Sequence, residues 1–142
     1  MYRKILCPVD GSETSNRGAT EAIRLAAQQH AALLFLHVVD SAALLMGMPV
    51  AEGAFDTLRS GGQNTLTEAV AAARTQGIDA QGQLREVLDG GVAQAIVEEA
   101  KEFGADLIVM GTHGRRGVSR LLLGSDAATV VGTSPVPVLL TK

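Results

Sequence analysis

The segment GADLIVMGTHGRRGVSRLLLGSDA, residues 104–127, contains a predicted strand, a loop and the start of a predicted helix. Asp106 to Met110 is apolar after its first residue, and a short apolar run of this kind predicts a buried β-strand. A loop rich in glycine and arginine follows, and Gly124-Ser125 open a short predicted helix that ends near Gly132. A strand, a glycine-rich loop and a helix in this order are typical of α/β domains that bind ligands where strands end.

Four further segments predict strands, and helical patterns separate them. These strands cover Ile5–Val9, Leu33–Val39, Ala80–Leu88 and Val136–Thr141. Helical spacing of apolar residues begins after Ser12, near Thr65 and at Ala93. The order β-α-β-α-β-α-β-α-β predicts an α/β fold in which helices cover both faces of a five-stranded parallel sheet, as one domain spanning residues 1–142.

The stretch from Asp40 to Gly62 has no regular pattern and is long for a loop in a compact domain. A lid, an interface segment and an irregular start of the next helix all remain open. Thr65 and Glu68 have the spacing of a capping box, so that helix begins at Thr65 or earlier. The glycine pair Gly61-Gly62 argues against an uninterrupted helix through this point.

Composition excludes several classes of function. Apolar residues make up 46% of the 142 residues and charged residues 19%, which indicates a folded chain. The net charge of −3, without a long basic run, argues against nucleic-acid binding, and no apolar window is long enough to span a membrane. The single cysteine, Cys7, excludes an internal disulfide and is predicted to be a buried apolar residue. With no signal-peptide pattern, we expect a cytoplasmic protein.

Two predicted strand ends carry the chemistry of a binding site. One is followed by Asp10-Gly11-Ser12 and the other by Gly111-Thr112-His113-Gly114. Glycine lets backbone N–H groups approach a ligand, and a helix N-terminus such as Ser125 favours phosphate. Neither the Walker-A pattern nor G-x-G-x-x-G occurs. From spacing alone, a phosphate cradle and a plain connection are both open.

The glycines resemble a family signature. Gly111, Gly114 and Gly124-Ser125 match the pattern G-2x-G-9x-G-[ST] of ATP-binding universal stress proteins. The segments ILCPVDGS (5–12), LFLHVVD (34–40), GADLIVMGTHG (104–114) and SPVPVLLTK (134–142) are similar to strands and turns of that family. The resemblance implies a doubly wound, flavodoxin-like adenine-nucleotide-binding fold with strand order 3-2-1-4-5.

The resemblance also implies where a nucleotide would bind. Pro8, Val9 and Asp10 would line the first turn, and Val38 would recognise adenine through its backbone. Met110 and Gly111 would contact adenine and ribose, and the phosphates would lie against Gly114, Gly124 and Ser125, with Arg115 and Arg116 adding positive charge. Asp126 departs from the small or apolar residue usual at its position, and it either points away from the phosphates, caps the helix or helps hold a metal.

No catalytic residue is predicted. His113 is interpreted as a loop side chain bonded to its neighbours, and His37 as a buried core or strand-end histidine. The implied ligand is ATP, or ADP or AMP, with Mg²⁺, and the implied function is that of a cytoplasmic stress-response or regulatory protein whose ATP hydrolysis, if any, is slow. The implied assembly is a homodimer through the terminal strand Val136–Thr141. An ATP-dependent enzyme of the same fold and a nucleotide-free dimeric interaction module remain alternatives.

Overall fold

The structure is a computed structural model that describes residues 1–42, 49–88, 91–113 and 123–142. Strands and helices alternate along the chain in the predicted order. The elements are β1 (Lys4–Pro8), α1 (Glu13–Gln29), β2 (Ala32–Asp40), α2 (Ala54–Arg74), β3 (Ala80–Val87), α3 (Val92–Phe103), β4 (Leu107–Gly111), α4 (Ser125–Thr133) and β5 (Val138–Thr141). Each predicted strand therefore exists, with ends displaced by a residue or two.

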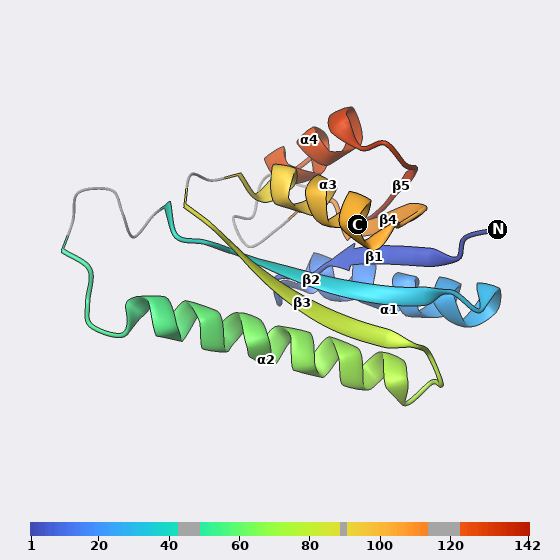
Figure 1. Cartoon of the computed structure of the whole chain (residues 1–142), viewed down its shortest axis with the longest axis horizontal. Coiled ribbons are helices and arrows are strands. Elements are labelled where there is room, and N and C mark those ends of the chain that lie inside the picture. Colours follow the sequence, from blue (N-terminus) through green and yellow to red (C-terminus); the bar gives the residue numbers. More distant parts are fainter. Residues whose placement is uncertain (43–48, 89–90, 114–122) are drawn as a thin grey trace.

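The five strands form one parallel sheet in the order β3-β2-β1-β4-β5. The central strand β1 pairs with β2 on one side and with β4 on the other, so the chain reverses its direction of travel across the sheet at β1 (Figure 1). Both the predicted fold class and the strand order implied by the family resemblance are confirmed.

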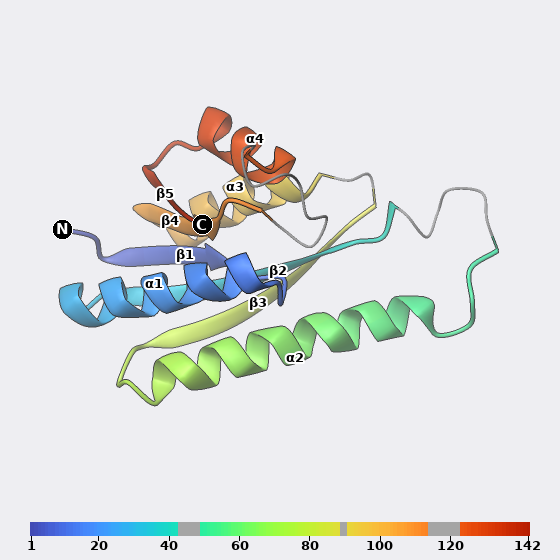
Figure 2. The ribbon, with the colours of Figure 1, turned by 180° about the vertical axis from the view of Figure 1, so that it is seen from behind.

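Two apolar clusters fill the two sides of the sheet. The helices α1 and α2 cover one face, and α3 and α4 cover the other (Figures 1 and 2). The largest fully buried side chain is Phe35, and the rest of the core is almost entirely aliphatic. Cys7 is fully buried, as predicted, and burial raises the pKa of its thiol well above the usual range.

Helix α2 differs from the sequence-based expectation. It starts at Ala54 and continues through Gly61-Gly62 without a break, so the argument against an uninterrupted helix was wrong. Thr65 lies inside the helix, where its hydroxyl donates to the Gly61 carbonyl at 3.1 Å instead of capping an N-terminus. Packing favours glycine at position 62, because a Cβ there would lie 2.3 Å from Cδ2 of His37.

The start of the terminal strand also differs from the expectation. The terminal strand begins at Val138 and not at Val136, although the Pro137 carbonyl already accepts a hydrogen bond from Ile108 N at 3.0 Å. Proline has no N–H to add to a strand ladder, so the prolines before β5 keep the strand short. Of the irregular stretch Asp40–Gly62, residues 43–48 lie outside the described residues, and residues 54–62 belong to α2.

Candidate functional site

The turn after β1 is held by a set of hydrogen bonds. Asp10 N donates to Ser15 Oγ at 2.9 Å, and the Asp10 carboxylate accepts from Ser12 N at 2.9 Å. Ser12 caps α1 by accepting from Ser15 N. Gly11 has a φ of +83°, which is a left-handed conformation that favours glycine. The turn is thereby fixed in one conformation, and Asp10 both stabilises it and stands at the end of β1.

The end of β2 lies beside this turn. Val9 N donates to Leu36 O at 2.8 Å, which is the last backbone bond between the two strands in the described part of the chain. The Val9 carbonyl accepts from Nδ1 of His37 at 2.8 Å, so this ring nitrogen carries the hydrogen. His37 is 6% exposed and is a buried, satisfied strand-end histidine, as predicted. Val38 follows it, two residues beyond the last pairing with β1.

Hydrogen bonds close the base of the loop that follows β4. Thr112 N donates to Thr141 O at 2.8 Å, and Gly124 N donates to Thr112 O at 2.7 Å. The hydroxyl of Thr14, in the first turn of α1, donates to the His113 carbonyl at 2.6 Å. The two ends of the loop therefore lie side by side, and its first residues are hydrogen-bonded to the first turn of α1.

Two of the signature glycines have a packing role. A Cβ on Gly111 would lie 2.8 Å from the Thr14 carbonyl oxygen, and a Cβ on Gly124 would lie 2.8 Å from the Thr112 carbonyl oxygen. Backbone atoms cannot move aside as a flexible side chain can, so both positions need glycine before any ligand is considered. These two glycines are thus explained by close packing at the two ends of the loop, and their spacing alone is weaker evidence for phosphate.

Helix α4 starts directly after this loop. Its N-cap residue, Gly124, provides no side-chain hydrogen bond. Ser125 and Asp126 occupy the first turn and are exposed, and a carboxylate at this end of a helix interacts favourably with the helix dipole. The remaining loop residues of the predicted site, Gly114, Arg115 and Arg116, lie outside the described residues.

The described residues of the predicted site lie at the carboxyl ends of the strands. Pro8 ends β1, and Val9 and Asp10 follow it. Val38 lies near the end of β2, and Met110 and Gly111 end β4. Gly124 is the N-cap residue of α4, and Ser125 and Asp126 are its first two residues. The sequence did not indicate that Thr14 and Ser15 would tie these segments together, because the Thr14 bond joins residues 99 positions apart. His113 bonds Thr112, with 2.9 Å between the hydroxyl and Nδ1, in keeping with a structural role.

The described residues contain no cluster of potential metal ligands and no helix that could span a membrane. Within residues 1–42, 49–88, 91–113 and 123–142, no three His, Cys, Asp or Glu side chains gather as metal ligands would. No helix in the same ranges has the length and apolar content needed to cross a membrane.

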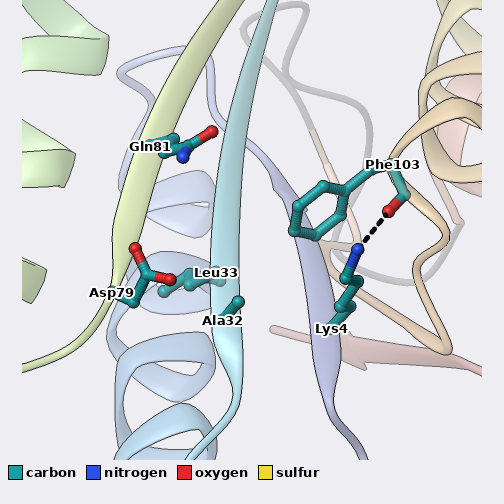
Figure 3. A pocket seen from close by; sticks show the side chains of 6 residues that line it. All are labelled: Lys4, Ala32, Leu33, Asp79, Gln81 and Phe103. Carbon is teal, nitrogen blue, oxygen red and sulfur yellow. Dashed lines mark hydrogen bonds between the residues drawn. The ribbon is translucent and has the colours of Figure 1, made fainter.

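A separate pocket lies at the opposite, amino-terminal end of the strands. Figure 3 shows its lining, with Phe103 from the end of α3 facing Lys4 and with Asp79 and Gln81 near the start of β3. The Lys4 ammonium donates to the Phe103 carbonyl at 3.2 Å and lies 5.1 Å from the centre of the ring. Its charge therefore stabilises the C-terminus of α3, and the pocket shares no residue with the predicted site.

Comparison with known proteins identifies relatives over the whole chain. The model of the universal stress protein family matches residues 1–142. The universal stress protein MJ0531 of Methanocaldococcus jannaschii is 38% identical over all of this chain and 83% of its own length. A universal stress protein of Thermus aquaticus is 36% identical over the full length of both chains.

Solved structures match the fold closely. The structure of protein MJ0577 has a TM-score of 0.86 and 26% identity, covering 100% of this chain and 96% of its own. A universal stress protein in complex with cAMP has a TM-score of 0.74 and 29% identity, covering 99% and 97%. One from Archaeoglobus fulgidus in complex with dAMP has a TM-score of 0.73 and 25% identity, covering 99% and 98%.

Proposed function

Because the chain belongs to the universal stress protein family, we propose that it binds an adenine nucleotide, ATP in particular, at the carboxyl ends of β1, β2 and β4. The observation that carries the proposal is the position of the carboxyl ends of β1, β2 and β4 and the N-terminus of α4. They lie together where the strand order reverses at β1. Open α/β sheets bind ligands at this place. Two related proteins of known structure are complexes with the adenine nucleotides cAMP and dAMP.

In the proposed site, the base, the ribose and the phosphates of the nucleotide each contact different elements. Val38 and Met110 lie on the adenine side, Asp10 lies at the ribose, and Gly124-Ser125 lie at the phosphates. The exposed first turn of α4 supports the phosphate position, since the N–H groups of a first turn have no partner within the helix and the helix dipole favours an anion. Gly114, Arg115 and Arg116 complete the phosphate side in this proposal, on the strength of the family signature.

A magnesium ion would arrive with the phosphates and keep most of its water ligands. Asp126 is the one carboxylate in the first turn of α4. It either repels the phosphates or contributes to holding the ion, and these two roles differ in how affinity responds to Mg²⁺. We propose a binding and regulatory role in stress response, in the cytoplasm, and no dedicated catalytic activity.

One observation favours a competing function. Gly111 and Gly124 are both explained by contacts with backbone atoms of the protein itself. A chain in which the glycines serve only the shape of the loop would be an interaction module that binds no nucleotide. The two functions differ in a single measurable property, which is affinity for ATP.

Calorimetric titration with ATP, with and without Mg²⁺, tests the proposal. The parent should bind, and Gly114→Val should abolish binding in a folded protein, because a side chain would occupy the space of the phosphates. Ser125→Ala should lose a contact worth about 1–3 kcal/mol. Gly132→Ala, at the far end of α4 in open space, is the matched control and should bind like the parent.

Asp126→Ala separates the two roles of the carboxylate. Tighter ATP binding that depends less on Mg²⁺ indicates repulsion, and weaker binding only in the presence of Mg²⁺ indicates a metal contact. A parent without ATP affinity, or a folded Gly114→Val that binds ATP as the parent does, would overturn the nucleotide proposal in favour of the interaction module.

A further inference from the structure

The ladder between β1 and β2 ends in an unusual way. In a parallel strand, the N–H and C=O of one residue face the same neighbour, and alternate residues face opposite neighbours. Leu36 O accepts from Val9 N, so Leu36 faces β1 and Val38, two residues later, faces the same side. A regular ladder would continue with a bond from Val38 N to the Val9 carbonyl. In the described part of the chain this bond is not formed.

The side chain of His37 takes the place of that bond. Its Nδ1 donates to the Val9 carbonyl at 2.8 Å, from the face of the sheet that α2 covers. Val9 is 5% exposed and His37 is 6% exposed. A carbonyl buried to this degree needs a donor, and the imidazole supplies it. The Val9 carbonyl is thus satisfied without any contribution from the backbone of β2.

Packing holds the imidazole in this position. Helix α2 crosses the ring at Gly62, where a Cβ would lie 2.3 Å from Cδ2 and 2.8 Å from Nε2. The ring therefore fills the space between β2 and α2 that a side chain on the helix would otherwise need. The bond to Val9 is part of the packed core and does not depend on a flexible side chain.

The consequence is a backbone edge beyond the end of β1 that the backbone of no described residue uses. The Val38 N–H and C=O point toward the side that β1 would occupy if it continued. Adenine presents an acceptor at N1 and a donor at its 6-amino group, which match one N–H and one C=O of a strand. Hypoxanthine presents a donor at N1 and an acceptor at O6, which would meet the same two groups with the wrong polarity.

We infer that His37 is a positioning and specificity residue for the adenine base: by taking the Val9 carbonyl out of the strand ladder, it keeps the Val38 backbone edge available to the base. This inference rests on the proposed nucleotide binding and adds to it the residue that makes the adenine edge. His37 itself does not touch the ligand. It acts through Val9 and Val38.

Amide hydrogen exchange in the nucleotide-free parent tests the first step. The Val38 N–H should exchange faster than that of Leu34, which lies within the paired region of β1 and β2. Addition of ATP should slow exchange at Val38. Equal protection of the two amides in the free protein would show that the Val38 edge is already engaged, and would overturn the inference.

Two substitutions of similar size test the role of the imidazole donor. Asparagine can place an amide nitrogen near the position of His37 Nδ1, whereas leucine can place only a methyl group there. His37→Leu should leave the Val9 carbonyl to the Val38 N–H, so Val38 becomes protected without nucleotide. ATP affinity should fall about tenfold or more, and the preference for ATP over ITP should shrink. His37→Asn should restore both properties.

The outcomes separate this inference from the proposed function. Denaturant unfolding of both variants establishes that each is folded and gives its loss of stability. If the parent binds no adenine nucleotide, the proposed function fails. If the parent binds ATP and the folded Leu and Asn variants match each other in affinity and in preference for ATP over ITP, the role of His37 fails while the proposed function stands.

Discussion

Arg85 on β3 faces three glutamates of α3. Its Nη2 lies 3.0 Å from Glu98, and its Nη1 lies 3.7 Å from Glu99 and 3.6 Å from Glu102. Nη1 is buried and forms no hydrogen bond to the described residues. Three carboxylates therefore share one guanidinium, and the cluster has an excess of negative charge. Glu99 is the most buried of the three carboxylates, so its ionisation should be the least favourable.

The pH dependence of stability should report on Glu99. Burial raises the pKa of Glu99 above its ordinary value of 4.5, Arg85 opposes this rise, and Glu102 adds to it. A carboxyl whose pKa is raised in the folded state stabilises most below 4.5, and this contribution is lost as pH rises through the folded-state pKa. Glu99→Gln removes the titration. The unfolding free energy of the parent minus that of the variant should fall as the pH rises above about 4.5.

Urea unfolding at several pH values measures this difference. A difference that stays constant, or that grows with pH, would mean that Arg85 compensates the charge of Glu99 fully in the folded protein.

Among the elements, α2 shows how tertiary packing overrides a local signal. Glycine in a helix interior is unfavourable, and a glycine pair is a reasonable sign of a break. The helix nevertheless passes through Gly61-Gly62. Packing requires a glycine at only one of these two positions. Gly61 has open space around the position of a Cβ, whereas Gly62 lies against His37 and Leu84.

Alanine at each of the two glycines should change stability in opposite directions. Gly61→Ala should raise the unfolding free energy by about 0.5–1 kcal/mol, since alanine is the better helix former and nothing obstructs it. Gly62→Ala should lower it by about 1–3 kcal/mol, because the new Cβ must displace the His37 ring. Urea denaturation of the pair provides the comparison, and each variant is the control for the other. Equal changes would contradict the packing explanation.

The elements that the sequence predicted best are those with uniform local patterns. The short apolar run Leu107–Met110 favours a buried strand, and Ser12 begins α1 as a typical N-cap residue. The alternation of such strands with helices was enough to predict a parallel sheet. The start of α2 was not predictable, because its N-cap is Gly53 in a left-handed conformation without a side-chain cap, so the usual start signal is missing.

The candidate site was predictable only in part. The family signature indicates Gly111, Gly124 and Ser125, but it does not show that the first two are needed for contacts with Thr14 and Thr112. The bond from Thr14 to His113 and the bond from His37 to Val9 join segments far apart in sequence. No local pattern predicts such contacts, since they arise from the order of strands in the sheet.

At the scale of the whole molecule, the two edges of the sheet differ. On β3, Gln81, Gly82 and Gln83 are exposed, so this edge offers little apolar surface to another chain. On β5, the residues are Val138, Leu139, Leu140 and Thr141, and Leu139 is 37% exposed. An apolar edge strand is a pairing surface unless a partner covers it. The contrast favours β5 as the edge through which two copies would meet.

The register of β5 indicates which backbone groups such a dimer would use. Ile108 N donates to Pro137 O, and Thr112 N donates to Thr141 O, so Pro137, Leu139 and Thr141 face β4. The backbone N–H and C=O groups of Val138 and Leu140 therefore point outward, away from β4. We expect a homodimer in which these outward N–H and C=O groups of two terminal strands lie at the two-fold axis.

Substitution at Leu140 should test this dimer without breaking the sheet. Leu140→Pro removes an outward N–H that the β4 ladder does not use, and proline is tolerated on edge strands with this orientation. Leu140→Ala is the matched control, since it also removes the leucine side chain but keeps the N–H. Sedimentation at micromolar concentration should give the mass of two chains for the parent and for Leu140→Ala, and of one chain for Leu140→Pro. A parent that sediments as a single chain would exclude the dimer, and a dimeric Leu140→Pro would place the interface elsewhere than on the β5 backbone.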